Sequence, residues 1–351
     1  MTDHLAEAYP ALGRQLPKVE LADLPTPVSL HRIVVPSGSY DVAVKHDEAT
    51  STLYGGNKVR KLEYLLQRAI DRGARRVATF GAVGSNHALA TAMHAAGLGL
   101  ECTCFLGHQK PTPKIPFTLN MHRKLGTEIV RYGRDVELLP LFRRYLQGRK
   151  TWVIPAGGTC WLGSVGFVNA GLEIASQVEM GLIPKPVRIY IAAGTTGTVA
   201  GLALGLAAAG LDSEIHAVQV ADYPFASEAK LRKLVAKMES ILVRFDSSFT
   251  ADDWEDRLIW RDEFLAGGYA RVDPETTNAV TFARNQLGLD LETTYTGKAM
   301  AALLQDLELM DTRGEPWLFW NTVNAQPLPV TAGAPDEGTG IPDEFLRYYE
   351  T

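Results

Sequence analysis

The sequence predicts an α/β protein built on mostly parallel sheets. Short apolar runs such as 188–194 and 214–222 alternate with segments of helical periodicity such as 164–179, and this alternation is typical of repeated strand–helix–strand units. A chain of 351 residues also has the length of two domains at roughly 150 residues each. Hydrophobic residues make up 46% and charged residues 21%, which is ordinary for a globular protein with a buried core.

Each expected strand or helix is bounded by a glycine or by a change of periodicity. Strands are expected at 75–83, 100–107, 188–194, 214–222 and 316–322, with shorter candidates at 127–133 and 151–158. Helices are expected at 86–96, 117–126, 164–179 and 198–209. The last of these is rich in small residues, so we expect it to pack closely on a sheet. The tail beyond Gln326 is rich in proline and glycine and is expected to be irregular.

Two breaks in composition divide the chain. One follows the Gly55-Gly56 turn, and the other is the glycine-rich stretch 155–166. We predict that residues 61–164 form a smaller α/β domain, inserted into a larger domain made of residues 1–60 and 165–351.

Charge, hydropathy and cysteine content limit the possible partners. The net charge is -5 and no lysine- or arginine-rich run stands out, so we do not expect nucleic acid as a partner. The first residues do not read as a signal peptide, and no apolar stretch reaches about 18 residues, so no membrane segment is expected. The three cysteines indicate a reducing compartment, which we take to be the cytoplasm. Cys102 and Cys104 alternate along an expected strand, which favours buried cysteines over metal ligands, and no metal site is predicted.

The segment 54–66, YGGNKVRKLEYLL, places a lysine at the start of a helix. The turn 55–57 precedes Lys58, and leucines follow at helical spacing. At a helix N-terminus the helix dipole and burial lower the pKa of an amine, which makes it more nucleophilic. A solvated lysine at a helix start is the alternative from this segment alone. Arg60 and Lys61 are expected to be solvated or to pair with Glu63 and neighbouring residues.

The segment GAVGSNHALATAMHAAG follows the strand at 75–83. Gly81 and Gly84 form a turn, and Ser85, Asn86 and His87 then begin a helix. This order puts backbone N–H groups and short polar side chains at the carboxyl edge of a parallel sheet, where ligands bind in open α/β folds. The alternatives are a plain helix cap for Ser85 and a structural helix histidine for His87.

A second strand-to-helix turn is typical of a phosphate site. The strand RIYIAA leads to Gly194, Thr195, Thr196, Gly197 and Thr198, and a helix follows. Glycines permit the tight turn, while free N–H groups and threonine hydroxyls can bind an anion. The loop has neither the lysine of a P-loop nor a magnesium ligand, so it fits one phosphate monoester better than a nucleotide. A tight turn without a ligand is the alternative.

Taken together, these segments provide what a pyridoxal 5'-phosphate site needs. In the same order along residues 20–325, the sequence resembles the 1-aminocyclopropane-1-carboxylate deaminase and D-cysteine desulfhydrase family, and GGNKVRKLEYLL is the most specific match. That family belongs to the tryptophan-synthase-β-like, fold type II pyridoxal phosphate enzymes. The resemblance implies two open, twisted, mostly parallel sheets flanked by helices. It also implies a homodimer, with the cofactor bound by the larger domain.

The resemblance assigns a first group of residues to the cofactor. Lys58 would hold it as a Schiff base and then move the α-proton of the substrate. Asn86 would hydrogen-bond its phenolic oxygen, residues 194–198 would bind its phosphate, and Thr296 would lie near its pyridine nitrogen.

A second group is assigned to the substrate. Ser85 would lie beside the substrate and share in proton transfer, with His87 and Thr322 also on the substrate side. Tyr295 would face the substrate over the cofactor ring, and Tyr269 matches a second active-site tyrosine of the family. Tyr295 alone, before a helix start, would be taken for a core tyrosine.

The resemblance has one departure. Where the family has His-Thr-Gly-Gly, this chain has Asn321-Thr322-Val323-Asn324, which adds two side chains where the pocket is expected. This change leaves the exact substrate, and its stereochemistry, open.

The expected activity is pyridoxal-phosphate-dependent β-elimination and deamination of a small amino acid, giving a keto acid and ammonia. Thr296 and His87 match the D-cysteine desulfhydrase branch, whereas the ring-opening deaminase branch has glutamate and glutamine at these positions. A threonine hydroxyl supports a neutral pyridine nitrogen and a weaker electron sink, which is adequate when a β-substituent leaves with the electrons. The alternatives are 1-aminocyclopropane-1-carboxylate deaminase and a weakly active protein that binds the cofactor or another small phosphate.

Overall fold

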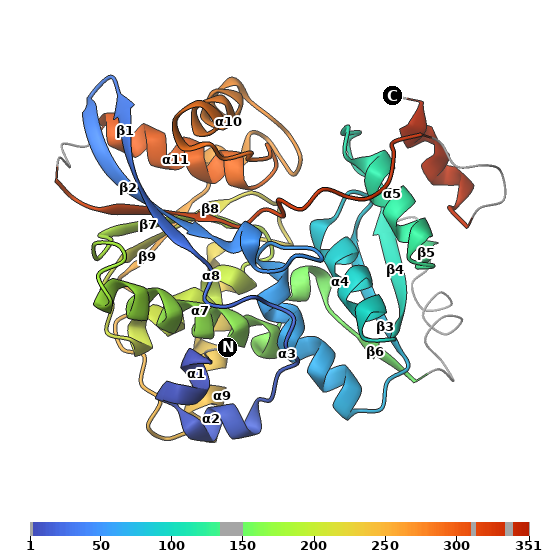
Figure 1. Cartoon of the computed structure of the whole chain (residues 1–351), viewed down its shortest axis with the longest axis horizontal. Coiled ribbons are helices and arrows are strands. Elements are labelled where there is room, and N and C mark those ends of the chain that lie inside the picture. Colours follow the sequence, from blue (N-terminus) through green and yellow to red (C-terminus); the bar gives the residue numbers. More distant parts are fainter. Residues whose placement is uncertain (1–2, 134–149, 310–313, 334–339, 351) are drawn as a thin grey trace.

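The chain folds into two open sheets flanked by helices (Figure 1). The computed structural model describes residues 3–133, 150–309, 314–333 and 340–350. In the view of Figure 1 one sheet lies on the left of the molecule and the other on the right. The expected α/β class, with two mostly parallel sheets, is therefore confirmed.

Within the described residues, the larger sheet has six strands in the order β1-β2-β10-β7-β8-β9. They are β1 (Val28–Val35), β2 (Gly38–His46), β7 (Arg188–Ala193), β8 (Glu214–Gln219), β9 (Leu258–Arg261) and β10 (Trp317–Asn321). β1 is antiparallel to β2, and the other neighbouring strands are parallel. The loops that follow β7, β8 and β10 therefore leave the sheet at one edge, where ligands bind in open α/β folds.

The smaller sheet is wholly parallel in the part of the chain that the structure describes, with strand order β5-β4-β3-β6. Its strands are β3 (Arg76–Ala82), β4 (Glu101–Gly107), β5 (Glu128–Arg131) and β6 (Thr151–Val153). All of them lie inside the predicted 61–164 unit, although the exact domain boundaries stay a prediction.

Helices cover both sheets (Figure 1). The α-helices described are α1 (His4–Ala8), α2 (Pro10–Gln15), α3 (Lys58–Asp71), α4 (Asn86–Gly97), α5 (Ile115–Lys124), α7 (Trp161–Glu179), α8 (Gly197–Ala208), α9 (Glu228–Phe245), α10 (Pro274–Leu287) and α11 (Thr296–Leu309). The 3-10 helices described are η1 (Asp47–Ala49), η2 (Ala156–Gly158), η3 (Glu263–Leu265) and η4 (Asp343–Tyr349). None of the described helices is long and apolar enough to cross a membrane.

Small residues let α8 approach its neighbour α7 closely. A Cβ on Gly201 would lie 2.0 Å from the carbonyl oxygen of Ser164, and one on Gly205 would lie 2.3 Å from that of Val168. Larger side chains would force these helices apart. The close packing expected for this helix is thus made chiefly against α7.

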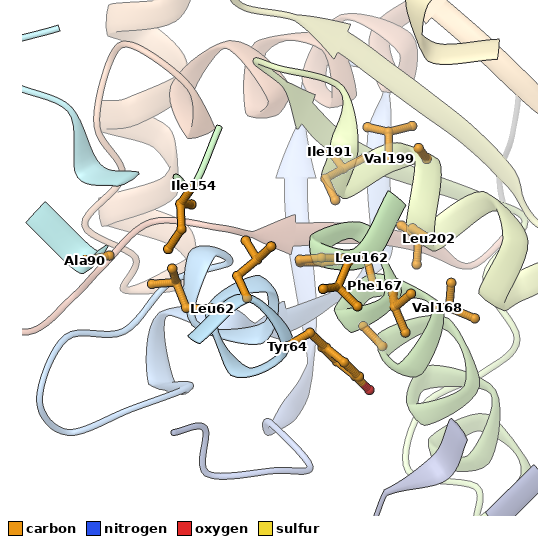
Figure 2. Close-up of a cluster of buried hydrophobic side chains, with 14 of the residues drawn as sticks. Leu62, Tyr64, Ala90, Ile154, Leu162, Phe167, Val168, Ile191, Val199 and Leu202 are labelled. Carbon is orange, nitrogen blue, oxygen red and sulfur yellow. The ribbon is translucent and has the colours of Figure 1, made fainter. Parts of the chain in front are cut away.

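One continuous hydrophobic core joins the two sheets. Figure 2 shows part of it, with Leu62 from α3, Phe167 from α7 and Ile191 from β7 among the buried side chains. A second buried cluster, which includes Phe319 of β10 and Met300 of α11, covers the other face of the larger sheet. Because α3 and α7 carry the core from one sheet to the other, the start of α3 is fixed between them.

The expected strands and helices that lie between 75 and 219, and the strand near 317, are present with ends shifted by a few residues. The sequence did not predict several other elements, among them the antiparallel pair β1 and β2, and α9, β9 and α10. The tail was expected to be irregular, but it contains η4, because Phe345 and Tyr348 are buried in the main core.

Candidate active site

Lys58 is the first residue of α3 and follows a turn that only glycine allows. Gly56 has a φ of +91°, and a Cβ there would lie 3.0 Å from the carbonyl oxygen of Thr322. The next N–H, that of Asn57, donates to the same carbonyl at 3.2 Å. Burial alone lowers the pKa of Lys58 to about 8, and no hydrogen bond or ion pair joins its Nζ to a described residue. The amine is therefore partly buried, is uncommitted in the sense that it has no described hydrogen-bond or ion-pair partner, and loses its proton more easily than a solvated lysine.

The turn after β3 presents Ser85 and Asn86. Ser85 caps α4, since its Oγ accepts from the N–H of Ala88 at 3.2 Å. The Oδ1 of Asn86 accepts from Lys114 Nζ at 2.5 Å and from the Tyr54 hydroxyl at 3.3 Å. With its oxygen engaged, the Asn86 amide keeps its NH₂ group to donate to a ligand acceptor.

His87 lies behind this turn and is almost fully buried. Its Nε2 accepts from the N–H of Gly158 at 3.2 Å and lies 2.9 Å from Thr79 Oγ1. Burial, followed by the charges of Lys58 and Lys61, lowers the pKa of His87 well below its usual value. The ring is thus neutral, and because Nε2 accepts the Gly158 N–H, its proton lies on Nδ1, with the Pro155 backbone as hydrogen-bond partner of the ring.

The expected phosphate-binding loop, residues 194–198, connects β7 to α8 and is called the cradle below. Thr196 adopts the left-handed region with a φ of +70°, a conformation that few non-glycine residues adopt and that is frequent at functional sites. A Cβ on Gly197 would lie 2.8 Å from both Ser164 Oγ and Thr159 Oγ1. The following residue, Thr198, accepts at its Oγ1 from Asn57 Nδ2 at 3.1 Å. This bond joins the cradle directly to the turn before Lys58.

A second glycine turn, η2, closes against the cradle. Gly157 has a φ of +66°, and a Cβ there would lie 2.1 Å from Thr195 Oγ1. Lys61 Nζ donates to the Gly157 carbonyl at 3.2 Å. Lys61 is buried, and burial together with the charge of Lys58 lowers its pKa well below its usual value. The expectation that Lys61 is solvated is therefore wrong, and the cradle has a lysine beside it that comes from α3.

Arg60 is not solvated either, because this side chain is fully buried, but it does pair with carboxylates, which are those of Asp47 and Glu173 and not that of Glu63. It donates to Asp47 at 2.8 Å and to both carboxylate oxygens of Glu173 at 2.8 and 2.9 Å. Lys45 Nζ completes the cluster at 2.5 Å from Glu173. The paired cations hold the pKa of Glu173 well below its usual range. These ion pairs tie the first turn of α3 to η1, β2 and α7.

Two tyrosines meet at the carboxyl edge of the larger sheet. The hydroxyls of Tyr269 and Tyr295 are 2.6 Å apart, and their rings pack edge to face. Tyr295 adjoins the cradle, since a Cβ on Gly194 would lie 3.3 Å from its Cε1. Burial raises the pKa of both hydroxyls, so both stay protonated near neutral pH. The loop that bears Tyr269 is held by Asp222, which accepts its N–H at 2.8 Å.

Thr296 begins α11 and is fully buried. Its Oγ1 donates to Glu292 Oε1 at 3.1 Å. The same carboxylate accepts backbone N–H groups of Thr294, Tyr295 and Thr296 at 2.7 to 2.8 Å. Glu292 is thus a carboxylate in contact with the Thr296 hydroxyl, and no sequence prediction included it.

The segment that departs from the family pattern packs on the lysine turn. Asn324 Oδ1 accepts from the Gly55 N–H at 2.7 Å. The expected extra side chain at 324 is therefore directed to the backbone of the turn. Asn321 Oδ1, at the end of β10, is buried and has no hydrogen-bond partner among the described residues.

The two cysteines on β4 lie side by side in the core. Cys102 and Cys104 are buried with their Sγ atoms 3.7 Å apart. Among the residues that the structure describes, no group of three or more histidine, cysteine or acidic side chains could hold a metal ion.

The assembled residues fit pyridoxal phosphate. An uncommitted lysine amine, a glycine-and-threonine cradle and the Asn86 amide lie around one region, joined by the Asn57–Thr198 bond. A protein that binds this cofactor needs an amine for its aldehyde and an anion site for its phosphate.

Comparisons with known proteins give the same result. The family model described as pyridoxal-phosphate dependent enzyme matches residues 19–321. D-cysteine desulfhydrase of Salmonella typhi is 34% identical over 327 residues, which cover 90% of this chain and 96% of that protein. That of Salmonella schwarzengrund is 33% identical over 326 residues, with the same coverage.

Solved structures with the same fold include a crystal structure titled as an ACC deaminase homologue. It is 30% identical, has a TM-score of 0.76, and is matched over 93% of this chain and 96% of that one. A hydrogen sulfide-producing enzyme of Fusobacterium nucleatum is 16% identical, with a TM-score of 0.60 over 86% of this chain and 94% of that one, which shows a shared fold. The chain therefore belongs to the pyridoxal-phosphate dependent enzyme family.

Proposed function

We propose that this enzyme removes a β-substituent from a small amino acid, with D-cysteine as the first candidate, and releases a keto acid and ammonia. The observation that carries the proposal is the uncommitted Lys58 amine, joined to the cradle through Asn57 and Thr198. The D-cysteine desulfhydrases among its relatives support the choice of substrate.

In this proposal Lys58 binds the cofactor aldehyde and then moves the α-proton of the substrate. A pKa near 8 leaves a useful fraction of neutral amine at physiological pH. Residues 194–198 bind the phosphate through backbone N–H groups and hydroxyls. Lys61 supports this loop from behind, because its Nζ donates to the carbonyl of Gly157, the residue that packs against Thr195. When bound, pyridoxal phosphate supplies the electron sink that stabilises negative charge at the α-carbon.

The tyrosine pair is proposed to donate a proton to the leaving group. Two hydroxyls have two protons, and the bond between Tyr269 and Tyr295 uses one of them. The other remains available to a thiolate that departs from the β-carbon. Their raised pKa values favour this acid role over a role as base. Ser85, His87 and Thr322 are proposed for the substrate side.

Thr296 distinguishes the two branches of the family. We propose that it lies near the pyridine nitrogen, where a neutral hydroxyl gives a weaker electron sink than a carboxylate. In the present structure the Thr296 hydroxyl donates its proton to the Glu292 carboxylate. To donate instead to a neutral pyridine nitrogen, Thr296 would have to break this hydrogen bond. A weaker sink is sufficient when a thiol leaves the β-carbon, because the leaving group takes the electrons.

A second candidate is 1-aminocyclopropane-1-carboxylate deaminase, favoured by the structural match to the ACC deaminase homologue. A weakly active cofactor-binding protein is a third. We further infer a cytoplasmic homodimer, with residues 61–164 as a separate domain. The family resemblance supports the dimer, and the three cysteines, unpaired by disulfides, support the compartment.

The test is a substrate panel. Pyruvate release is measured from D-cysteine, β-chloro-D-alanine, their L-isomers and 1-aminocyclopropane-1-carboxylate, with the last followed as 2-oxobutyrate. We expect one of the β-substituted D-amino acids to be the best substrate and the cyclopropane to be poor. Faster turnover of the cyclopropane than of every β-substituted compound would identify the deaminase. No turnover of any of them would favour the binding protein.

A further inference from the structure

The C-terminal segment passes from the larger sheet to the smaller one. After β10 it runs along α5, where Asn120 Nδ2 donates to the carbonyls of Thr331 and Gly333 at 2.8 Å. The segment ends in η4, which lies beside α5 (Figure 1). Phe345 and Tyr348 of η4 are buried in the main core. The tail is therefore an anchored part of the smaller-sheet side of the molecule.

Tyr348 reaches the loop that follows β4. Its hydroxyl donates to the carbonyl of Gln109 at 3.0 Å and accepts from the N–H of the same residue at 3.1 Å. The neighbouring His108 Nδ1 lies 3.2 Å from the same oxygen. One hydroxyl thus fixes both polar groups of the Gln109 backbone.

Gln109 in turn contacts the turn that precedes α4. Its Oε1 accepts from the N–H of Gly84 at 3.1 Å. A Cβ on Gly84 would lie 3.1 Å from the Gln109 amide nitrogen, so the glycine lets this side chain pack closely on the turn. Gly84 directly precedes Ser85. The same loop also donates to Asn86 through Lys114.

We propose that Gln109 and Tyr348 are positioning residues for the turn Gly84–Asn86, so that the C-terminal segment completes the active site from outside it. Neither residue touches the proposed cofactor residues. They act through the Gly84 N–H, whose direction sets the positions of the Ser85 hydroxyl and the Asn86 amide. This inference rests on the proposed function, which assigns Ser85 to the substrate and Asn86 to the cofactor.

The structure supplies a matched control on the same 3-10 helix. Tyr349, next to Tyr348, donates its hydroxyl to Asn120 Oδ1 at 2.9 Å. Tyr349→Phe therefore removes a hydroxyl that fastens the tail to the smaller-sheet side through one hydrogen bond, whereas Tyr348→Phe removes a hydroxyl that makes two with Gln109. Only Tyr348 leads on to Gln109 and the active-site turn.

The test uses holoenzyme and four variants: Tyr348→Phe, Gln109→Leu, Gln109→Glu and Tyr349→Phe. Amide hydrogen exchange of the peptide that spans residues 83–89 is measured together with kcat, KM and thermal stability. Tyr348→Phe and Gln109→Leu should speed exchange in this peptide and lower kcat/KM about tenfold, the effect of losing the one neutral hydrogen bond between Gln109 and the Gly84 N–H. Gln109→Glu keeps the oxygen acceptor and should restore both readouts toward wild type. Tyr349→Phe should leave both unchanged.

Two results would overturn the proposal. One is unchanged exchange at 83–89 in both Gln109→Leu and Tyr348→Phe. The other is an equal effect of Tyr349→Phe and Tyr348→Phe, which would mean that tail attachment alone matters. If Tyr348→Phe does not fold, Gln109→Leu with its Gln109→Glu counterpart decides the question. If wild-type enzyme turns over no substrate, the proposed function fails, while hydrogen exchange still decides whether Gln109 and Tyr348 hold the turn.

Discussion

Two cations on the first turn of α3 have opposite surroundings. Arg60 is fully buried and hydrogen-bonded to the carboxylates of Asp47 and Glu173. Lys58, two residues earlier, has no carboxylate partner among the described residues, and burial lowers its pKa to about 8. A charge that stabilises the fold is paired, whereas an amine that must react is left without a partner. The difference separates the residue that positions the helix from the one that we expect to do chemistry.

The largest effect is expected from Lys58→Ala. Loss of both the cofactor attachment and the proposed base should lower turnover by several orders of magnitude. Thermal stability of the cofactor-free protein should not fall, because Lys58 makes no hydrogen bond or ion pair with a described residue and its burial carries an electrostatic cost. Steady-state assays and melting curves measure the two effects, with the exposed Lys185→Ala as control. If Lys58→Ala keeps substantial turnover, Lys58 is not the reactive amine of the comparison.

Arg60→Met should have the opposite profile, with a large loss of stability. Removal of this cation leaves two buried carboxylates short of a partner, at a cost of about 3–5 kcal/mol in the free energy of unfolding. Arg284→Met is the control, since Arg284 and Asp290 form an exposed pair at 2.9 Å, and its loss should cost less than about 1 kcal/mol. Denaturant unfolding measures both. Equal effects of the two variants would mean that the buried cluster has no special role.

Gly197→Val tests the cradle, the loop that the Asn57–Thr198 hydrogen bond joins to the turn before Lys58. Its Cβ would lie 2.8 Å from two hydroxyl oxygens, those of Ser164 and Thr159, so the start of α8 must shift. We expect cofactor affinity to fall by about tenfold or more, the equivalent of about 1.4 kcal/mol. Gly97→Val, at the open end of α4, should leave affinity unchanged. Unaltered affinity in a folded Gly197→Val protein would reduce this loop to a tight turn.

A further effect is the pH dependence of stability in the cofactor-free protein. The folded-state pKa of Lys58 is lowered from 10.5 to about 8, so between these values the unfolded chain binds more protons than the folded one. Stability contributed by this site therefore rises with pH across that window, and the burial penalty is greatest below pH 8. Lys58→Met should be more stable than wild type at pH 7 by about 1–3 kcal/mol, and the difference should shrink toward pH 10.5. The free energy of unfolding is measured for both proteins across this pH range. A difference between them that stays the same at every pH would contradict the lowered pKa of Lys58.

Features set by nearby residues could be predicted from the sequence. A glycine turn between an apolar strand and a helix is a local signal, and it located the turns at 84–86 and 194–198, as well as Lys58 at a helix start. The small residues of α8 likewise indicated close packing. These predictions needed only the order of a few adjacent residues.

Features set by distant residues could not. Arg60 and Lys61 look like surface cations in their own segment, and only the packing of α3 against α7 and η2 buries them. Their spacing offered a partial signal, because Lys61 lies three residues after Lys58 and thus on the same face of α3. The contact between Tyr348 and Gln109 joins residues 239 positions apart, and no local pattern specifies it.

Reductive trapping tests the central claim most directly. Borohydride treatment of the yellow holoenzyme should fix the cofactor on its lysine, and peptide mapping then identifies that lysine. We predict a single labelled peptide that contains Lys58, even though Lys61 is buried only three residues away. A label on Lys61 or on Lys298 would contradict the assignment of Lys58 as the reactive amine.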